Sequence, residues 1–274
     1  MNDTENLNLR NVTHAVRTSS FWKDLIFHEV VGSTNDAAKA LAFRGAPAGT
    51  VVVADEQTAG RGRLNRRWVA PPQSSLLCSL VFRPALPPRK AQQLTMLCAM
   101  ASADAIRARA DLEVALKWPN DLVVASQTLA PGSSRWRKLA GLLTETEVTN
   151  GTVAFVVVGI GINVNVPEDT LDDLSPDATS ILVEIGHRVD RGALLADVLT
   201  AIEARYERLK RGEDPHREWA SRLATLGRQV VVTTGKEQLR GIAAAVNEDG
   251  ALLLRTEDGS LRPVRAGDVS LSQH

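Results

Sequence analysis

The chain has 274 residues, of which 44 % are hydrophobic, enough to bury the core of one medium domain and a small one. Its 32 basic residues balance 32 acidic ones, whereas nucleic-acid-binding proteins usually have a basic face. No stretch is apolar for long enough to span a membrane, and the first 20 residues lack an apolar signal-peptide core. These features predict a soluble globular protein that binds neither DNA nor a membrane.

The N-terminal third predicts a tail followed by alternating helices and strands. Residues 1–20 are expected to form a flexible tail. Ser33, Thr34 and Asn35 have the short polar side chains that cap helices, and a helix is expected from Asp36 to Arg44. Further patterns predict a strand at 51–54, a strand buried on both faces at 76–82 and a long helix at 92–109.

The remainder of the chain predicts a second group of strands and a change of pattern near Gly227. Strands are expected at 113–117, 139–147 and 152–158, the last two joined by a hairpin turn at Asn150-Gly151. Helices are expected around 194–202 and 219–226. Beyond Gly227, short alternating runs separated by glycine turns predict a small β-barrel. The fold class is therefore α+β with a mixed or antiparallel sheet, divided into the tail, a domain of residues 21–227 and a barrel of residues 228–274.

The cysteines and histidines argue against several chemistries. Cys78 and Cys98 lie in apolar runs, where a free thiol packs as a small hydrophobic side chain. Two such thiols favour the reducing cytoplasm over a disulfide framework. The five histidines have no metal-ligand spacing, and no Ser–His–Asp or Cys–His pattern indicates a protein nucleophile.

The segment from Gly60 to Trp68, here called the arginine loop, contains four arginines and no acid. Arginine binds phosphate and carboxylate oxygens through a planar fork, and glycine lets the backbone approach a ligand closely. The segment lacks the third glycine of a dinucleotide fingerprint and the Gly-Lys-Ser/Thr of a Walker A loop. It predicts a site for a doubly anionic ligand held by side chains, with a solvated basic turn as the alternative.

Residues 117–121 (Lys-Trp-Pro-Asn-Asp) are expected to turn between two strands because proline disfavours helical backbone before it. Asn120 and Asp121 offer oxygens to a nucleotide or to Mg²⁺, or else form an Asx turn. Downstream, Lys138 opens a strand, where a lysine is normally a surface charge, but a lysine close to a glycine such as Gly141, which lets a ligand approach, is less usual.

Gly159 and Gly161 follow an apolar strand and leave two interpretations open. Without side chains they form a flat patch on which an apolar ring can rest, or they mark a bulge. The acidic segment 166–178 is expected to be a mobile surface loop.

Five segments occur in an order that resembles the biotin–protein ligase family, biotin–[acetyl-CoA-carboxylase] ligase: 32–35, 56–63, 117–121, 138–141 and 159–163. The resemblance runs from about residue 25 to the C-terminus. It implies a mixed, largely antiparallel sheet packed with helices, like that of class II aminoacyl-tRNA synthetases. It also implies that biotin and ATP give biotinyl-5′-AMP and pyrophosphate, after which biotin passes to one lysine of a biotin carboxyl carrier protein.

The resemblance also implies site residues. The implied catalytic residues are Arg63 and Lys138, which would cancel the repulsion between a carboxylate and an α-phosphate. The arginine loop would close over the hydrolysable acyl-adenylate. The implied Mg²⁺ contact, accompanying ATP, is Asp121. The implied biotin-binding residues are Ser33, Thr34, Asn35, Gln57, Gly60, Arg61, Gly62, Arg63, Lys138, Gly141 and Gly161. The implied ATP-binding residues are Arg63, Arg66, Trp68, Lys117, Asn120 and Asn163.

Two departures from the family pattern affect these expectations. Asn65 replaces a glycine found in many relatives, and asparagine also tolerates the left-handed conformation. About 30 residues precede Ser33, too few for a DNA-binding domain, so a ligase without repressor activity is expected. A homodimer is compatible with the resemblance. The rival interpretations are a lipoate or octanoyl ligase, a biotin-dependent DNA regulator and a non-catalytic biotin sensor.

Overall fold

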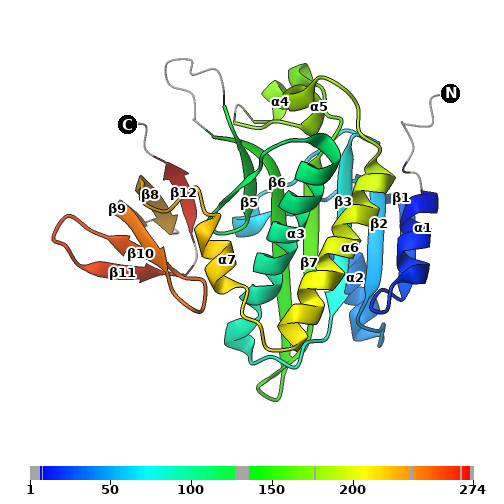
Figure 1. Ribbon diagram of the computed structural model, residues 1–274, viewed down its shortest axis with the longest axis horizontal. Helices are drawn as coiled ribbons and strands as arrows, with labels where there is room; N and C mark the ends of the chain where they lie inside the picture. The colour runs from blue at the N-terminus through cyan, green and yellow to red at the C-terminus, as the bar shows by residue number, and fades with distance from the viewer. Residues whose placement is uncertain are drawn as a thin grey trace.

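A seven-stranded mixed sheet forms the centre of the molecule (Figure 1). The computed structural model describes residue 7 and residues 9–126, 136–175, 177–234, 237–265 and 267–271. The strands are β1 (Asp24–Val31), β2 (Thr50–Gln57), β3 (Ser75–Phe82), β4 (Ala115–Lys117), β5 (Asp121–Ala125), β6 (Trp136–Thr149) and β7 (Thr152–Asn163). Their order is β1-β2-β3-β7-β6-β5-β4, with β1 and β2 parallel and the other neighbours antiparallel. The expected mixed, largely antiparallel sheet is confirmed.

The central strands β3 and β7 explain the apolar runs of the sequence. Every residue of β3 is buried, as the run at 76–82 predicts. Strand β7 continues through Gly159 and Gly161 to Asn163 and pairs with β3 without a register shift. The shift between β6 and β7 lies at Glu147/Val148, near the hairpin turn. The glycines therefore belong to a flat strand and do not form a bulge.

Helices cover the two faces of the sheet unequally (Figure 1). The long helices α3 (Gln92–Ala110) and α6 (Arg191–Lys210) pack side by side over one face, with α7 (His216–Ser221) next to α3. The opposite face carries α2 (Thr34–Phe43), which contacts β2, β3 and β7. Short helical turns connect these elements: η1 (Arg63–Asn65), η2 (Pro88–Lys90), α4 (Glu168–Leu174) and α5 (Ile181–Ile185).

The prediction of a flexible tail over residues 1–20 is wrong for its second half. Residues 9–18 form α1 (Leu9–Thr18), which packs against α6 and β1. Val12 and Val16 are buried and lie one helical turn apart, so they form an apolar stripe facing the core. Residues 1–6 and 8 lie outside the described residues.

The prediction of a loop over residues 166–178 is also wrong, because residues 168–174 form α4. Glu168 and Asp169 lie in the first turn, where negative charge stabilises the exposed backbone N–H groups of a helix. Leu171 is buried and packs with Val166 and Ala178 in a small apolar cluster. The acidic residues that suggested a solvated loop thus favour the start of a helix.

A second, five-stranded antiparallel sheet follows the helices, as the change of pattern near Gly227 predicts. Its strands are β8 (Gln229–Thr234), β9 (Glu237–Val246), β10 (Leu252–Arg255), β11 (Leu261–Val264) and β12 (Asp268–Leu271), in the order β11-β10-β9-β8-β12. The Trp118 indole N–H donates to the Gly250 carbonyl at 2.9 Å and ties the two sheets together. None of the described helices is long and apolar enough to cross a bilayer.

A buried ion pair joins β2 to the start of α6. The Arg191 side chain is 1 % exposed, and its guanidinium donates to Asp55 Oδ1 at 2.8 Å and to the Ser75 carbonyl at 3.1 Å. Removing one partner of such a pair leaves an uncompensated buried charge, which costs more than the pair itself contributes.

We therefore expect Arg191→Met to lower the free energy of unfolding by about 3–5 kcal/mol. Asp55→Leu combined with Arg191→Met should recover most of this loss, because no buried charge remains. Arg188→Met, three positions earlier and exposed, is the matched control. Urea unfolding measures all three, and equal midpoints for Arg191→Met and Arg188→Met would contradict the assignment.

Candidate active site

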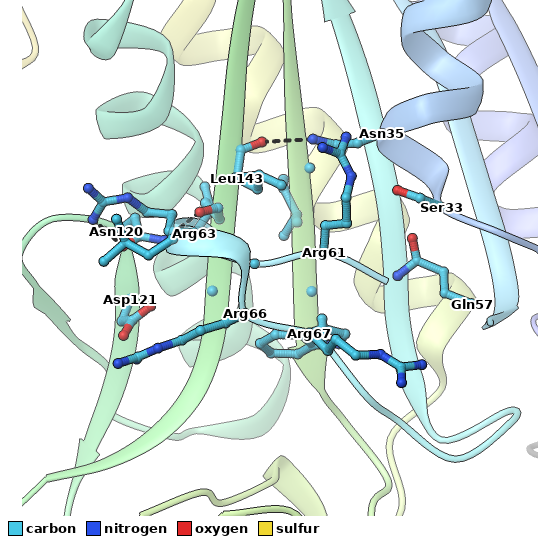
Figure 2. A pocket seen from close by; sticks show the side chains of 18 of the residues that line it. Ser33, Asn35, Gln57, Arg61, Arg63, Arg66, Arg67, Asn120, Asp121 and Leu143 are labelled. Atoms are coloured by element: carbon cyan, nitrogen blue, oxygen red, sulfur yellow. Dashed lines mark hydrogen bonds between the residues drawn. The ribbon is translucent and has the colours of Figure 1, made fainter. Parts of the chain in front are cut away.

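A cleft of about 820 Å³, including space open to solvent, lies on the α2 side of the sheet (Figure 2). Strands β6 and β7 form its floor, the start of α2 and the end of β2 form one wall, and the arginine loop covers it. The C-terminal sheet contributes Asp268 at the rim. The cleft brings together Ser33, Thr34, Asn35, Gln57, Arg61, Gly62, Arg63, Arg66, Trp68, Asn120, Asp121, Lys138, Gly141 and Gly161.

The wall formed by α2 and β2 is polar and internally ordered. Ser33 begins α2, and its side chain accepts from the Asp36 N–H at 3.5 Å. The backbone N–H of Thr34 donates to Gln57 Oε1 at 2.7 Å, and the Thr34 hydroxyl lies 3.0 Å from the same oxygen. Because Oε1 is taken, the Gln57 amide nitrogen is the group left for the cleft (Figure 2). This wall therefore presents a hydrogen-bond donor to a ligand.

Asn35 and Ser79 extend the polar wall into the sheet. Ser79 Oγ donates to Asn35 Oδ1 at 2.6 Å and lies 2.8 Å from the Thr34 hydroxyl. Asn35 Nδ2 donates to the Leu143 carbonyl at 3.2 Å and to Glu145 Oε2 at 3.0 Å. A Cβ at Gly159 would lie 2.1 Å from Asn35 Oδ1, so only glycine permits this approach. The glycine thus makes room for the asparagine that closes this end of the cleft.

The arginine loop is a compact turn. The Gly62 N–H donates to the Arg66 carbonyl at 2.7 Å, and the Trp68 N–H donates to the Gly60 carbonyl at 3.0 Å. Asn65 has φ +59°, the left-handed conformation expected at this position. A Cβ at Gly60 would lie 2.5 Å from the Trp68 carbonyl oxygen, so this glycine is needed for the turn to close.

Each guanidinium of the loop has a protein partner. Arg61 bridges Asp36 at 2.6 Å and Glu145 at 2.7 Å, and Arg66 pairs with Asp268 of the C-terminal sheet. Arg63 donates to Asn120 Oδ1 at 3.2 Å, a contact visible at the left of Figure 2, and Arg67 donates to the Thr58 carbonyl at 3.1 Å. The loop is therefore anchored on both sides of the cleft, unlike a freely solvated basic turn.

Arg63 is the more enclosed of the two arginines assigned to biotin. Burial lowers the pKa of its guanidinium, and the charges of Asp121 and Asp268 partly oppose this effect. The group remains a cation, because an arginine pKa lies far above neutrality. A partly desolvated cation interacts more strongly with an anion than an exposed one does.

Lys138 supplies a second cation to the cleft. Its ammonium lies 2.7 Å from Asp121 Oδ1 and 5.8 Å from the centre of a Trp68 ring. An ammonium has three N–H donors, so the Asp121 contact leaves donors for a ligand. Asp121 thus orients Lys138 in the structure, a contact that the sequence interpretations of Asp121 (nucleotide, Mg²⁺ or an Asx turn) did not include.

Trp68 lies on the glycine patch of β6 and β7. Gly141 and Gly161 pair across the two strands, and a Cβ at Gly161 would lie 2.7 Å from the indole. A Cβ at Gly141 would lie 3.3 Å from both Lys138 and Trp68. The ring on this patch is the protein's own Trp68, and Gly159 lies against Asn35 instead, so the role of these glycines toward a ligand ring stays a prediction.

Two expected ATP-binding residues lie apart from the cleft lining. Asn163 donates to the Thr179 carbonyl at 3.0 Å and lines an adjoining hollow on the other side of Trp68, together with Arg66 and Lys138. Lys117 pairs in register with Asp121 at the end of β4 but lines neither space.

Three residues of this region were not predicted from the sequence. Ser79 carries a hydroxyl within the buried apolar run of β3, and this polarity was the available signal. Glu145 lies in a half-buried part of β6 among other polar residues, where an acid is not unusual. Asp268 had no signal, because its role depends on how the second sheet docks. Among the described residues, no group of three or more His, Cys, Asp or Glu side chains could hold a metal ion.

Known proteins resemble this chain in sequence and in fold. Bifunctional ligase/repressor BirA of Bacillus subtilis is 34 % identical over 263 residues, covering 95 % of this chain and 78 % of the relative. A biotin–[acetyl-CoA-carboxylase] ligase of Paracoccus denitrificans is 35 % identical over 83 % of this chain and 92 % of its own. A biotin protein ligase from Aquifex aeolicus in complex with biotin and ATP has a TM-score of 0.70 at 28 % identity, covering 92 % of this chain and 100 % of its own.

The family matches divide in the same way as the two sheets. Residues 225–272 match the biotin protein ligase C terminal domain, which spans the second sheet. Residues 27–163 match the Biotin/lipoate A/B protein ligase family, and they include most of β1, all of β2 to β7 and the arginine loop. The chain belongs to the Biotin/lipoate A/B protein ligase family.

Proposed function

We propose that the chain is an ATP-dependent biotin–protein ligase, which makes biotinyl-5′-AMP and transfers biotin to a lysine of a biotin carboxyl carrier protein. The observation that carries this proposal is a single cleft with a hydrogen-bonding end at Thr34 and Gln57 and a cationic end at Arg63 and Lys138. The ureido ring of biotin fits the hydrogen-bonding end. The carboxylate of biotin, next to the α-phosphate of ATP, fits the cationic end. The likeness to biotin–[acetyl-CoA-carboxylase] ligases supports the same reaction.

The first step joins two anions. A biotin carboxylate oxygen attacks the α-phosphorus of ATP, an O–P bond forms, and pyrophosphate leaves with the electrons of the broken bond. Arg63 and Lys138 both contribute positive charge at the cationic end of the cleft, so they reduce the repulsion and stabilise the charge that develops. No protein nucleophile is needed, because the substrate carboxylate performs the attack.

The nucleotide is assigned to the cationic end and the adjoining hollow. Trp68 separates the two spaces and offers an aromatic face to a base, and Asn163 lies in the hollow beside it. We propose that Mg²⁺ binds together with ATP. Asp121 and Asp268 are the carboxylates on the cleft lining, and a Mg²⁺ held mainly by phosphate oxygens and water needs one or two of them.

The second step transfers the acyl group to a protein. The neutral ε-amine of the acceptor lysine attacks the biotinyl carbonyl carbon, an amide bond forms, and AMP leaves. The arginine loop would keep water from the adenylate until the acceptor arrives. The proposal includes the carrier protein as the acceptor and a location in the cytoplasm. It also includes ligation without DNA binding, and it is compatible with a homodimer.

Binding calorimetry with biotin and with lipoate tests the assigned substrate. We expect biotin to bind and lipoate to bind at least about tenfold more weakly, because a dithiolane ring leaves the Gln57 amide nitrogen without an acceptor. Gln57→Leu should reduce this preference and Gln73→Leu should not. Tight lipoate binding without biotin binding would contradict the proposal in favour of a lipoate ligase.

Lys138→Ala should slow adenylate formation by about two to three orders of magnitude, as the loss of a group that stabilises transition-state charge does. Lys90→Ala, on the surface turn η2, is the control. Biotin-dependent release of pyrophosphate from ATP measures the step, and circular dichroism establishes that the fold persists. Near-normal release from Lys138→Ala would remove this residue from the mechanism.

Arg63→Ala should speed the dissociation of biotinyl-AMP by about tenfold or more while changing biotin affinity less, because the guanidinium is assigned to the carboxyl and phosphate oxygens. Arg67→Ala, whose guanidinium contacts the Thr58 carbonyl, is the matched control from the same loop. Rapid gel filtration of the enzyme with labelled adenylate gives the rate. Unchanged retention of the adenylate would refute the lid function of the loop.

A further inference from the structure

Glu145 gathers three donors that belong to different parts of the site. Its Oε2 accepts from Asn35 Nδ2 at 3.0 Å and from Arg61 at 2.7 Å, and its Oε1 accepts from Lys39 at 2.8 Å. Asn35 and Lys39 lie on α2, Arg61 lies in the arginine loop, and Glu145 itself lies on β6. One carboxylate thus joins the polar wall, the lid and the floor of the cleft.

The charge of Glu145 fixes which way the Asn35 amide faces. An ionised carboxylate only accepts hydrogen bonds, so Asn35 must turn its nitrogen toward Glu145 and its oxygen toward Ser79. Burial alone would raise the pKa of Glu145, but the hydrogen bonds from Lys39 and Asn35, with the charge of Arg61, lower it overall. The opposite amide orientation would set Asn35 Oδ1 against the carboxylate with no proton between them.

A series of contacts joins Asn35 to Gln57 along the wall. Asn35 Oδ1 accepts from Ser79, Ser79 lies 2.8 Å from the Thr34 hydroxyl, and the Thr34 backbone N–H holds Gln57 Oε1. The series therefore ends at the Gln57 amide nitrogen, which faces the cleft. Figure 2 shows Asn35 and the Arg61 guanidinium side by side near the Leu143 carbonyl.

We propose that Glu145 is a positioning residue that orients Asn35 for biotin and anchors Arg61 of the lid, and so couples biotin binding to closure of the arginine loop. This inference rests on the proposed biotin ligase function. Glu145 acts through its neighbours, whereas Arg63 and Lys138 are assigned to the reacting groups. Its loss should therefore affect biotin more than ATP.

The test uses Glu145→Gln in the full chain, with Glu147→Gln as the matched control two positions along β6. An amide side chain keeps the size of glutamate but removes its charge, and its NH2 group must face either Lys39 or the Asn35 and Arg61 donors. We expect the KM for biotin to rise by about 10- to 100-fold, as loss of a charge-assisted hydrogen bond does, with the KM for ATP changed by less than about threefold. Biotinyl-AMP should also dissociate faster. Glu145→Asp, which keeps the charge but shortens the reach, should give an intermediate biotin KM.

A double-mutant cycle separates positioning from a general loss of structure. If Glu145 acts through Asn35, Asn35→Ala combined with Glu145→Gln should bind biotin about as weakly as Asn35→Ala alone. A biotin KM within about twofold of the parent in folded Glu145→Gln, or additive losses in the double variant, would overturn the inference. If the parent chain itself releases no pyrophosphate with biotin and ATP, the proposed function fails, a result distinct from failure of the Glu145 variants.

Discussion

The site depends on keeping several cations close together before any anion binds. Arginine and lysine side chains that converge on one cleft repel each other, and burial makes this repulsion stronger. The structure meets the constraint with carboxylates from separate elements: Asp36 on α2, Glu145 on β6, Asp121 on β5 and Asp268 on β12. Each carboxylate holds a cation in place, so the positive charge is arranged before the ligand arrives and little reorganisation is required during the reaction.

The same pairing explains why the two sheets belong to one catalytic unit. The smaller sheet reaches the cleft through Asp268, which holds Arg66 of the arginine loop. On the other side of the loop, Arg61 is held by the larger sheet and by α2. The loop thus spans the junction between the two sheets, and its position depends on how the smaller sheet packs against the larger one.

The sequence predicts the features that depend on neighbouring residues. Ser33 as a helix cap, the turn at Asn65 and the buried strand at 76–82 follow from local pattern, and the structure agrees with all three. The segments that line the cleft could be singled out because each occupies a few consecutive positions. Local pattern does not predict contacts between residues that are far apart in the sequence, so the roles of Ser79 and Glu145 were not predicted. The short apolar stripe of α1 was overlooked for a different reason, since its two valines are surrounded by polar residues.

The cross-strand pairing of Gly141 with Gly161 makes the shape of the cleft depend on the hairpin turn at Asn150-Gly151. A shift of one residue between β6 and β7 would exchange the two faces of the shifted strand and bring Leu142 or Ile160 to the cleft side. A shift of two residues would keep the faces but separate the glycines. Insertions and deletions in this hairpin should consequently be rare in active homologues, even though its turn is exposed and lies at the other end of the hairpin from Gly141 and Gly161. Selection would then act on the number of residues in the hairpin, while the identity of the turn residues could vary.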